Sequence, residues 1–247
     1  MKLVVFGGAG GWPPAGGACS GYLIEHEGFR LFVDPGYAVL PRLLTVLKAA
    51  AIDAVLVSHG HPDHVADLSP LLRARVMHDD PAPPLPVYGL PGSVDRVLAI
   101  DEAVTVAGAR EVYAFGAGES FRIGPFGIAS TALPHFVPNV GVRIEAGGRS
   151  LTYTGDAGPD DALVRLADDT DLLLAEATYV DTVPDGPAGN LNSAAEVGRQ
   201  ARIARARHLV LTHLWPGTDA TASRAAARRA FDGPIEVATP GLEIDLG

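Results

Sequence analysis

Cysteine is almost absent from this 247-residue sequence, which contains Cys19 and no other. A single cysteine allows no internal disulfide and excludes the zinc-finger arrangements that need paired thiolates. The sequence also has no apolar run near the roughly 18 residues that a membrane-spanning helix requires. The apolar start at 2–6 stops at Gly7 and is too short for a signal peptide, so it is expected to form a strand. These absences favour a cytoplasmic protein without membrane association.

Positive charge is scarce as well. The formal net charge is −10, and lysine occurs only as Lys2 and Lys48. Because binding to nucleic acid normally needs an excess of positive charge against the phosphates, no strong nucleic-acid binding is expected. The four arginines at 199, 202, 205 and 207 are interpreted as a solvated helix face rather than an RNA contact. A small anionic substrate remains compatible with this charge, since a bound divalent cation can dominate the local field.

The pattern of short apolar runs predicts strands and helices interspersed along the whole chain, with no linker between independent domains. Predicted strands lie at 2–6, 22–26, 29–33, 52–57, 87–88, several places between 111 and 155, 172–175, 208–212, 235–237 and 242–245. Predicted helices lie at 38–50, 64–76, 93–100, 160–167, from the capping pair Ser193 and Glu196 onward, and at 219–231. This order fits two stacked sheets with helices outside, a four-layer αββα sandwich of the α/β class (α+β in some schemes), but the pattern alone also fits other α/β folds. We expect residues 1–247 to form one domain.

The most informative stretch is segment 59–64, His-Gly-His-Pro-Asp-His, which holds three imidazoles and a carboxylate. Imidazole nitrogens suit zinc, manganese or iron, and a carboxylate adds a hard oxygen. The segment follows the predicted strand 52–57, in the position where α/β proteins place their chemistry. On one tight loop, His59 and His61 can face one ion while Asp63 and His64 face a second. Single histidines often only cap helices, but a cluster this dense favours a metal site.

Two metal ions need about six to eight ligands, so further candidates are expected elsewhere in the chain. His135, Asp156 and His213 each stand just after a predicted strand. Each would be unremarkable alone, but with segment 59–64 they complete a set of five histidines and two aspartates at strand ends. The remaining histidines lack this placement and are assigned structural or surface roles: His26, His78 and His208.

These motifs, taken in order along nearly the whole chain, resemble those of the metallo-β-lactamase fold superfamily. The resemblance implies the αββα sandwich and a site for two divalent ions, usually zinc, with manganese or iron as alternatives. The implied ligands are His59, His61 and His135 for one ion, Asp63, His64 and His213 for the other, and Asp156 as a bridge between them. True β-lactamases usually carry a cysteine ligand and a secretion signal, and this sequence offers neither.

Segments 153–156, 176–179 and 209–213 are similar to the tRNase Z and phosphodiesterase branch of the superfamily, with two departures. The arm with which tRNase Z enzymes grip tRNA is often inserted between the third and fourth motifs, but here His135 and Asp156 are only 21 residues apart. Asn190 stands where the branch commonly has a histidine that assists the leaving group. An amide can hydrogen-bond a phosphate oxygen but cannot act as an acid at neutral pH.

The expected function is metal-dependent hydrolysis of a small phosphodiester, cyclic or short and nucleotide-like. Two ions about 3.5 to 4 Å apart can share a water and lower its pKa towards 7, so that the hydroxide attacks phosphorus. Asp63 is expected to orient this nucleophile, and Asn190 to contact the substrate.

Several alternatives use the same ligands: a lactonase, thioesterase or arylsulfatase, a tRNA 3′-processing endonuclease, or a metal-binding protein with lapsed activity. A diiron redox protein is disfavoured, because such members usually have glutamate where this chain has His61. A homodimer is common among similar proteins.

Overall fold

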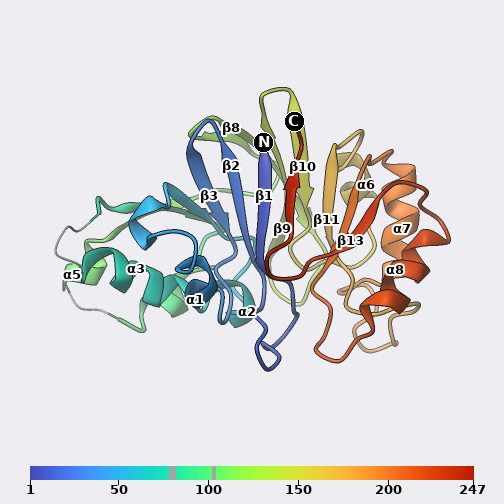
Figure 1. Cartoon of the computed structure of the whole chain (residues 1–247), viewed down its shortest axis with the longest axis horizontal. Coiled ribbons are helices and arrows are strands. Elements are labelled where there is room, and N and C mark those ends of the chain that lie inside the picture. The colour runs from blue at the N-terminus through green and yellow to red at the C-terminus, as the bar shows by residue number, and fades with distance from the viewer. Residues whose placement is uncertain (78–81, 102–103) are drawn as a thin grey trace.

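Two mixed β-sheets stacked face to face form the centre of the structure, a computed structural model that describes residues 1–77, 82–101 and 104–247 (Figure 1). In spatial order, the first sheet contains β14 (Glu243–Asp245), β1 (Lys2–Gly7), β2 (Gly21–His26), β3 (Phe29–Val33), β4 (Ala54–Leu56), β5 (Leu85–Gly89) and β6 (Arg110–Ala114). The second contains β13 (Ile235–Val237), β12 (Leu209–Thr212), β11 (Leu172–Glu176), β10 (Arg149–Tyr153), β9 (Asn139–Ala146), β8 (Phe126–Leu133) and β7 (Ser120–Ile123). Both sheets are therefore mixed, with a parallel part and an antiparallel part.

The central strands are apolar on both faces because both faces are covered. In β11, Leu172 and Leu174 point into the core between the sheets, whereas Leu173 and Ala175 point into the core beneath the outer helices. Successive side chains of a strand alternate between its faces, so a continuous apolar run is the expected signature of a strand buried on both sides. The core between the sheets includes the fully buried rings of Tyr22 and Tyr153.

Helices cover the two outer faces and complete the αββα sandwich, which confirms the predicted fold (Figure 1). Against the first sheet lie α1 (Leu40–Leu43), the 3₁₀ turn η1 (Ala49–Ala51), α2 (Pro62–Val65), α3 (Leu68–Val76), α4 (Asp95–Leu98) and α5 (Val104–Ala107). Against the second lie α6 (Asp161–Leu166), α7 (Ala194–Ile203) and α8 (Ala220–Arg228). The Ser193 hydroxyl accepts from the backbone N–H of Glu196 and caps α7. The reciprocal half of the predicted capping box is absent, because Ser193 N–H donates to Asn192 Oδ1 and the Glu196 carboxylate pairs with Arg199. None of the helices in the described ranges is long and apolar enough to cross a membrane.

The prediction of one helix over 38–50 is wrong. Regular helix ends at Leu43, and the Thr45 hydroxyl donates to the Arg42 carbonyl, an acceptor that a continuing helix would need for its backbone. Val46 is 64% exposed, and Lys48 is extended before the η1 turn. The pattern of leucine and valine in this stretch therefore reflects irregular packing rather than one helical face.

The predicted helix over 64–76 also differs from the structure, which has two helices. Helix α2 starts earlier, at Pro62, where the fixed backbone angle and missing N–H of proline suit a first helical position. The chain then turns at Asp67 before α3, and the Asp67 carboxylate accepts from the backbone N–H of Leu40. Asp63 and His64 are therefore helical residues whose side chains α2 orients.

Six of the strands that end at one edge of the sandwich carry the residues of the candidate site. In the first sheet, β3 and β4 run parallel to each other. In the second sheet, β10, β11 and β12 run parallel. Strand β8 has the same direction as β10, because both pair antiparallel with β9. The residues at or just beyond these six ends meet in one place, described below. Between His135 and Asp156 the chain forms a single hairpin, β9–β10, whose turn residues Gly147 and Gly148 have positive φ. This segment, all of it described, contains no protruding arm.

Candidate metal centre

The first cluster combines three imidazoles and one carboxylate. His61 Nδ1 lies 3.1 Å from His59 Nε2 and 3.0 Å from His135 Nε2. The Oδ2 atom of Asp156 lies 3.7 Å from the Nε2 atoms of both His59 and His135. His59 and Asp156 are buried, and His61 and His135 are half-buried towards the surface. Three loops, those after β4, β8 and β10, thus bring four ligand-type atoms together.

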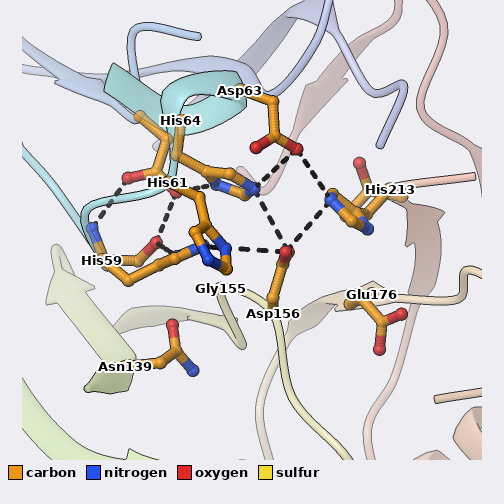
Figure 2. A network of polar contacts seen from close by, with 12 residues as sticks. His59, His61, Asp63, His64, Asn139, Gly155, Asp156, Glu176 and His213 are labelled. Carbon is orange, nitrogen blue, oxygen red and sulfur yellow. Dashed lines mark hydrogen bonds and ion pairs between the residues drawn. The ribbon is translucent and has the colours of Figure 1, made fainter. Parts of the chain in front are cut away.

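The second cluster lies beside the first and shares Asp156 with it (Figure 2). His213 Nε2 lies 3.1 Å from Oδ2 of Asp63 and 3.1 Å from Oδ2 of Asp156. His64 Nε2 lies 3.2 Å from Oδ1 of Asp156 and 3.6 Å from Oδ2 of Asp63. The structure therefore brings together all seven residues that the sequence proposes as ligands, in the two groups that the resemblance implies.

The donor atoms fit a divalent cation in both spacing and chemistry. An ion bound tetrahedrally at about 2.1 Å holds neighbouring ligand atoms about 3.4 Å apart, close to the separations in both clusters. His64 Nε2 and Asp156 Oδ1 face each other across 3.2 Å, and neither buried atom makes a hydrogen bond of good geometry with any described residue. A bound cation would give both atoms a better partner than this contact does.

Hydrogen bonds to the ring nitrogens that face away from the clusters hold four of the imidazole rings in place. The nitrogen on the far side of each of four rings has a partner: His59 with Ser58 Oγ at 3.0 Å, His64 with Asp34 Oδ2 at 2.8 Å, His135 with the Asn190 carbonyl at 2.9 Å and His213 with Thr178 Oγ1 at 3.0 Å. Such contacts select the tautomer that presents Nε2 to a metal and fix the ring orientation. The clusters are thus pre-organised.

Asp34 is the principal site residue that sequence reasoning missed. Its buried carboxylate accepts four hydrogen bonds: from Ser58 N at 2.8 Å, Ser58 Oγ at 2.6 Å, His64 Nδ1 at 2.8 Å and Tyr153 Oη at 2.7 Å. The available signal was its place directly after the buried strand β3, the same placement that marks the ligands. Two residues later, Gly36 lies so close to α2 that a Cβ atom there would be 1.9 Å from the Asp63 carbonyl oxygen.

A glycine-rich loop after β1 closes one side of the second cluster. The backbone N–H of Gly11 donates to Asp63 Oδ2 over 2.7 Å. A Cβ atom on Gly10 would lie 2.6 Å from the His213 ring, so this close approach requires glycine. Trp12 follows and is 51% exposed, with its ring centre 6.2 Å from that of Trp215. The loop thereby orients the Asp63 carboxylate and places aromatic side chains at the rim.

The two clusters differ in protonation. Burial lowers the pKa values of His59, His61 and His135, so these imidazoles are neutral at neutral pH and ready to bind a cation. Burial also acts on His64 and His213, but the carboxylates of Asp156 and Asp63 outweigh it and raise both pKa values. Conversely, His213 and His64 outweigh burial at Asp156 and hold its pKa well below the usual range. Without a metal, the second cluster is an ion-pair network.

Two further residues support the site through the loop before α7. Burial raises the pKa of Glu176, at the end of β11, to about 8, and its carboxyl group accepts from the backbone N–H groups of Thr178 and Asn192. Asn190 contributes its backbone carbonyl to His135, a role independent of its side chain. That the Asn190 side chain binds substrate stays a prediction.

The other residues considered from the sequence lie away from the clusters. His26 packs against Phe126, and His208 contacts Glu236. His78 lies outside the described residues. The arginines at 199, 205 and 207 pair with nearby carboxylates, but 205 and 207 lie beyond the end of α7, so the interpretation of all four as one helix face is wrong. That these arginines do not contact RNA stays a prediction.

The chain matches the family model described as the β-lactamase superfamily domain over residues 29–214. Together with the sandwich and the donor set, this match defines the class: the chain belongs to the metallo-β-lactamase superfamily, as a metal-dependent hydrolase. The probable metallo-hydrolase YhfI of Bacillus subtilis is 33% identical over 245 residues, 98% of each chain. The crystal structure of YhfI, a metallo-β-lactamase fold protein, has a TM-score of 0.89 and covers 98% of both chains.

A curated relative confirms the resemblance to the tRNase Z branch, and a solved structure shows the shared fold. A ribonuclease Z of Mycobacterium bovis is 30% identical over 267 residues, which is 96% of this chain and 95% of that relative. The short form of human tRNase Z, at 22% identity and a TM-score of 0.78 over all of both chains, shares the fold.

Proposed function

We propose that this chain hydrolyses small phosphodiesters, cyclic or short and nucleotide-like, with two divalent ions bound at the clusters described above. Zinc is the favoured metal because imidazole and carboxylate ligands at this spacing suit it, with manganese or iron as alternatives. The observation that carries the proposal is the position of Asp156, whose Oδ2 atom lies within 3.7 Å of ligand nitrogens in both clusters. One carboxylate shared by two donor sets supports a pair of ions rather than two independent ones.

When bound, a pair of divalent ions supplies Lewis acidity, which polarises a phosphoryl group and makes water a better nucleophile at neutral pH. Asp156 sets the spacing of the two donor sets. Asp63, held by Gly11 N–H and His213, presents a carboxylate that accepts a hydrogen bond from the attacking water and orients it. The Asn190 amide donates to a substrate oxygen but supplies no proton, so the alkoxide that leaves a nucleotide-like substrate takes its proton from another residue or from water.

The size of the substrate is inferred from charge and from the β9–β10 hairpin. The ribonuclease Z relative has a name that denotes action on phosphodiester bonds, which supports the bond type. The net charge of −10 and the absence of an arm between His135 and Asp156 favour a small anion over a long nucleic acid. A cytoplasmic location and a homodimer stay predictions.

A substrate panel tests the proposal. Zinc-loaded protein should hydrolyse bis-p-nitrophenyl phosphate at least about 100-fold faster than a lactone, a thioester or an aryl sulfate, and a chelator should abolish the turnover. If the protein hydrolyses the lactone, the thioester or the aryl sulfate faster, the proposed phosphodiester substrate is wrong and the preferred compound gives the substrate class. No turnover of any substrate by the wild type or by Asn190→His, which restores the missing acid, would indicate lapsed activity.

Metal binding should depend on pH differently at the two clusters. Because His64 and His213 have raised pKa values, a cation must displace their protons, and its affinity falls as the pH drops through neutrality. The first cluster, with lowered histidine pKa values, loses affinity only at lower pH. His135→Ala and His213→Ala each leave one cluster intact for zinc titrations. From about pH 8 to about pH 6, we expect zinc affinity to fall more than about 100-fold in His135→Ala but less than about 10-fold in His213→Ala. Equal dependence would contradict the assignment.

A further inference from the structure

Strand β6 lies at the edge of the first sheet beyond β5 and is the most exposed of the four edge strands in the described sheets. Val112 is 48% exposed and Tyr113 is 44% exposed, whereas the large apolar side chains of β7, β13 and β14 are at least partly buried. The register with β5 is continuous from Arg110 to Ala114, so no bulge interrupts β6. Edge strands are usually protected by proline, lysine or a bulge, and β6 has none of these. It therefore presents a regular edge on which another strand can pair.

The apolar side chains of β6 continue both core layers of the sandwich. On the inner face, the ring of Tyr113 stacks on Tyr88 with 5.0 Å between the ring centres, and Tyr88 packs against the core between the sheets. On the outer face, Val112 is in register with Val87, which belongs to the core beneath the outer helices. Successive side chains of a strand alternate between its faces, so one added strand would cover both Val112 and Tyr113.

The backbone of β6 has groups that point away from β5. Just before β6, the Ala109 carbonyl accepts from the Leu85 N–H of β5. Just after it, the Phe115 N–H donates to the Gly89 carbonyl of β5. Alternate residues of a strand bond to the same neighbour, so the odd-numbered residues face β5. Because β5 is the only described strand that pairs with β6, the outward-facing N–H and C=O groups have no strand partner; they belong to Arg110, Val112 and Ala114.

We propose that β6 pairs with β6 of a second copy of this chain, antiparallel about a twofold axis at Val112. Arg110 of each copy then lies opposite Ala114 of the other, so every outward-facing N–H and C=O group of the two strands finds a partner. The apolar side chains on both faces of the edge become covered, and the sheet continues from one copy into the other. This pairing gives the predicted homodimer a specific interface and does not depend on the proposed function.

The side chains of β6 favour a second copy over an unrelated strand, because in this register they are complementary to themselves. Glu111 lies opposite Tyr113 of the second copy, in the closely spaced pairs of an antiparallel ladder. The Tyr113 hydroxyl donates to Glu111 within one copy over 2.7 Å, so each carboxylate is an acceptor suited to either hydroxyl. An axis at Glu111 would place the two Glu111 carboxylates opposite each other, which is unfavourable. An axis at Tyr113 would leave the outward groups of Arg110 beyond the end of the opposite strand.

Sedimentation equilibrium of the full chain tests the proposal. The wild type should show a reversible equilibrium between the 25.6 kDa monomer and a dimer of twice this mass. Val112→Pro removes an outward-facing N–H at the axis, a change that an edge strand tolerates, and should raise the dimer Kd at least about tenfold.

A pair of charge changes at the exposed Ala114 tests the register. Ala114→Glu places a carboxylate opposite Arg110 of the second copy and should lower the dimer Kd about fivefold, whereas Ala114→Arg places like charges together and should raise it about fivefold. General repulsion between chains of net charge −10 would give the reverse order, because glutamate adds to that charge and arginine reduces it. Ala225→Glu and Ala225→Arg, at an exposed alanine of α8, are the matched controls and should change the Kd little.

The outcomes decide the proposal. A wild type that stays monomeric at about 1 mM, where only association weaker than about 4 kcal/mol escapes detection, would overturn it. A dimer on which the Ala114 variants act no differently from the Ala225 variants would also overturn it, since another surface would then form the dimer. If Val112→Pro does not fold, the opposite effects of the two Ala114 variants decide alone.

Discussion

Replacing Asp156 with alanine should remove both metal ions and lower phosphodiester turnover at least about 1,000-fold. The reason is geometric: Asp156 Oδ2 lies 3.1 Å from His213 Nε2 and 3.7 Å from the Nε2 atoms of His59 and His135. Its loss also leaves His64 and His213 without the carboxylate that most strongly raises their pKa values. Metal content after dialysis, measured by mass spectrometry, and kcat/KM for bis-p-nitrophenyl phosphate provide the two readouts.

His135→Ala is the matched comparison, because it removes a ligand of the first cluster alone. It should lower zinc affinity at one site and leave the second ion in place. Two retained ions and full activity in Asp156→Ala would show that the carboxylate does not bridge the clusters. Loss of both ions in His135→Ala would show that the two sites fill only together.

Replacing Asp34 with alanine should cost about 3–5 kcal/mol of unfolding free energy in the metal-free protein, because it leaves buried donors without an acceptor. Four donor groups lose their acceptor, among them the fully buried His64 ring and Tyr153 hydroxyl. Zinc affinity at the second cluster should also fall about 10- to 100-fold, because the carboxylate orients His64. Urea unfolding of the metal-free variant and zinc titration measure the two effects.

Tyr153→Phe keeps the experiment informative if Asp34→Ala does not fold. It removes one donor and leaves the contact between Asp34 and His64, so it should cost about 1 kcal/mol and change zinc affinity little. Wild-type stability in Asp34→Ala would mean that the carboxylate is dispensable to the fold. Unchanged zinc affinity would mean that it does not position His64.

Much of the site was predictable because its ligands are chemically distinctive and stand at strand ends. Segment 59–64 concentrates histidine and aspartate locally, and His135, Asp156 and His213 each directly follow an apolar run. Parallel strands end at the same edge of a sheet, so residues far apart in sequence could be expected to meet. The same runs predicted buried strands, since strands covered on both faces read as continuous apolar segments, but it was the family resemblance that singled out the αββα layers among α/β folds.

The helix boundaries were less predictable. Leucine and valine between 38 and 50 have a helix-like spacing, yet regular helix ends at Leu43 and Val46 is exposed to solvent. Segment 59–64 was expected to be a loop, but Pro62 starts α2 inside it. Local propensity could not decide either case, because tertiary contacts such as that between Asp67 and the Leu40 N–H decide where the chain turns.

The superfamily resemblance and the seven candidate ligands could be predicted from sequence, because apolar runs and dense histidines are recognisable locally. The surroundings of these ligands could not, because they depend on how distant segments pack. Nothing in the sequence distinguishes Asp34 from other aspartates, because its partners Ser58, His64 and Tyr153 come from distant segments. The hydrogen bond between the Asn190 backbone carbonyl and His135 likewise could not be predicted, because every residue has a backbone carbonyl. A cavity beside His61 is lined by α2, by α4 and by Pro138, which are distant in the chain, so its largely apolar wall forms only when those segments pack.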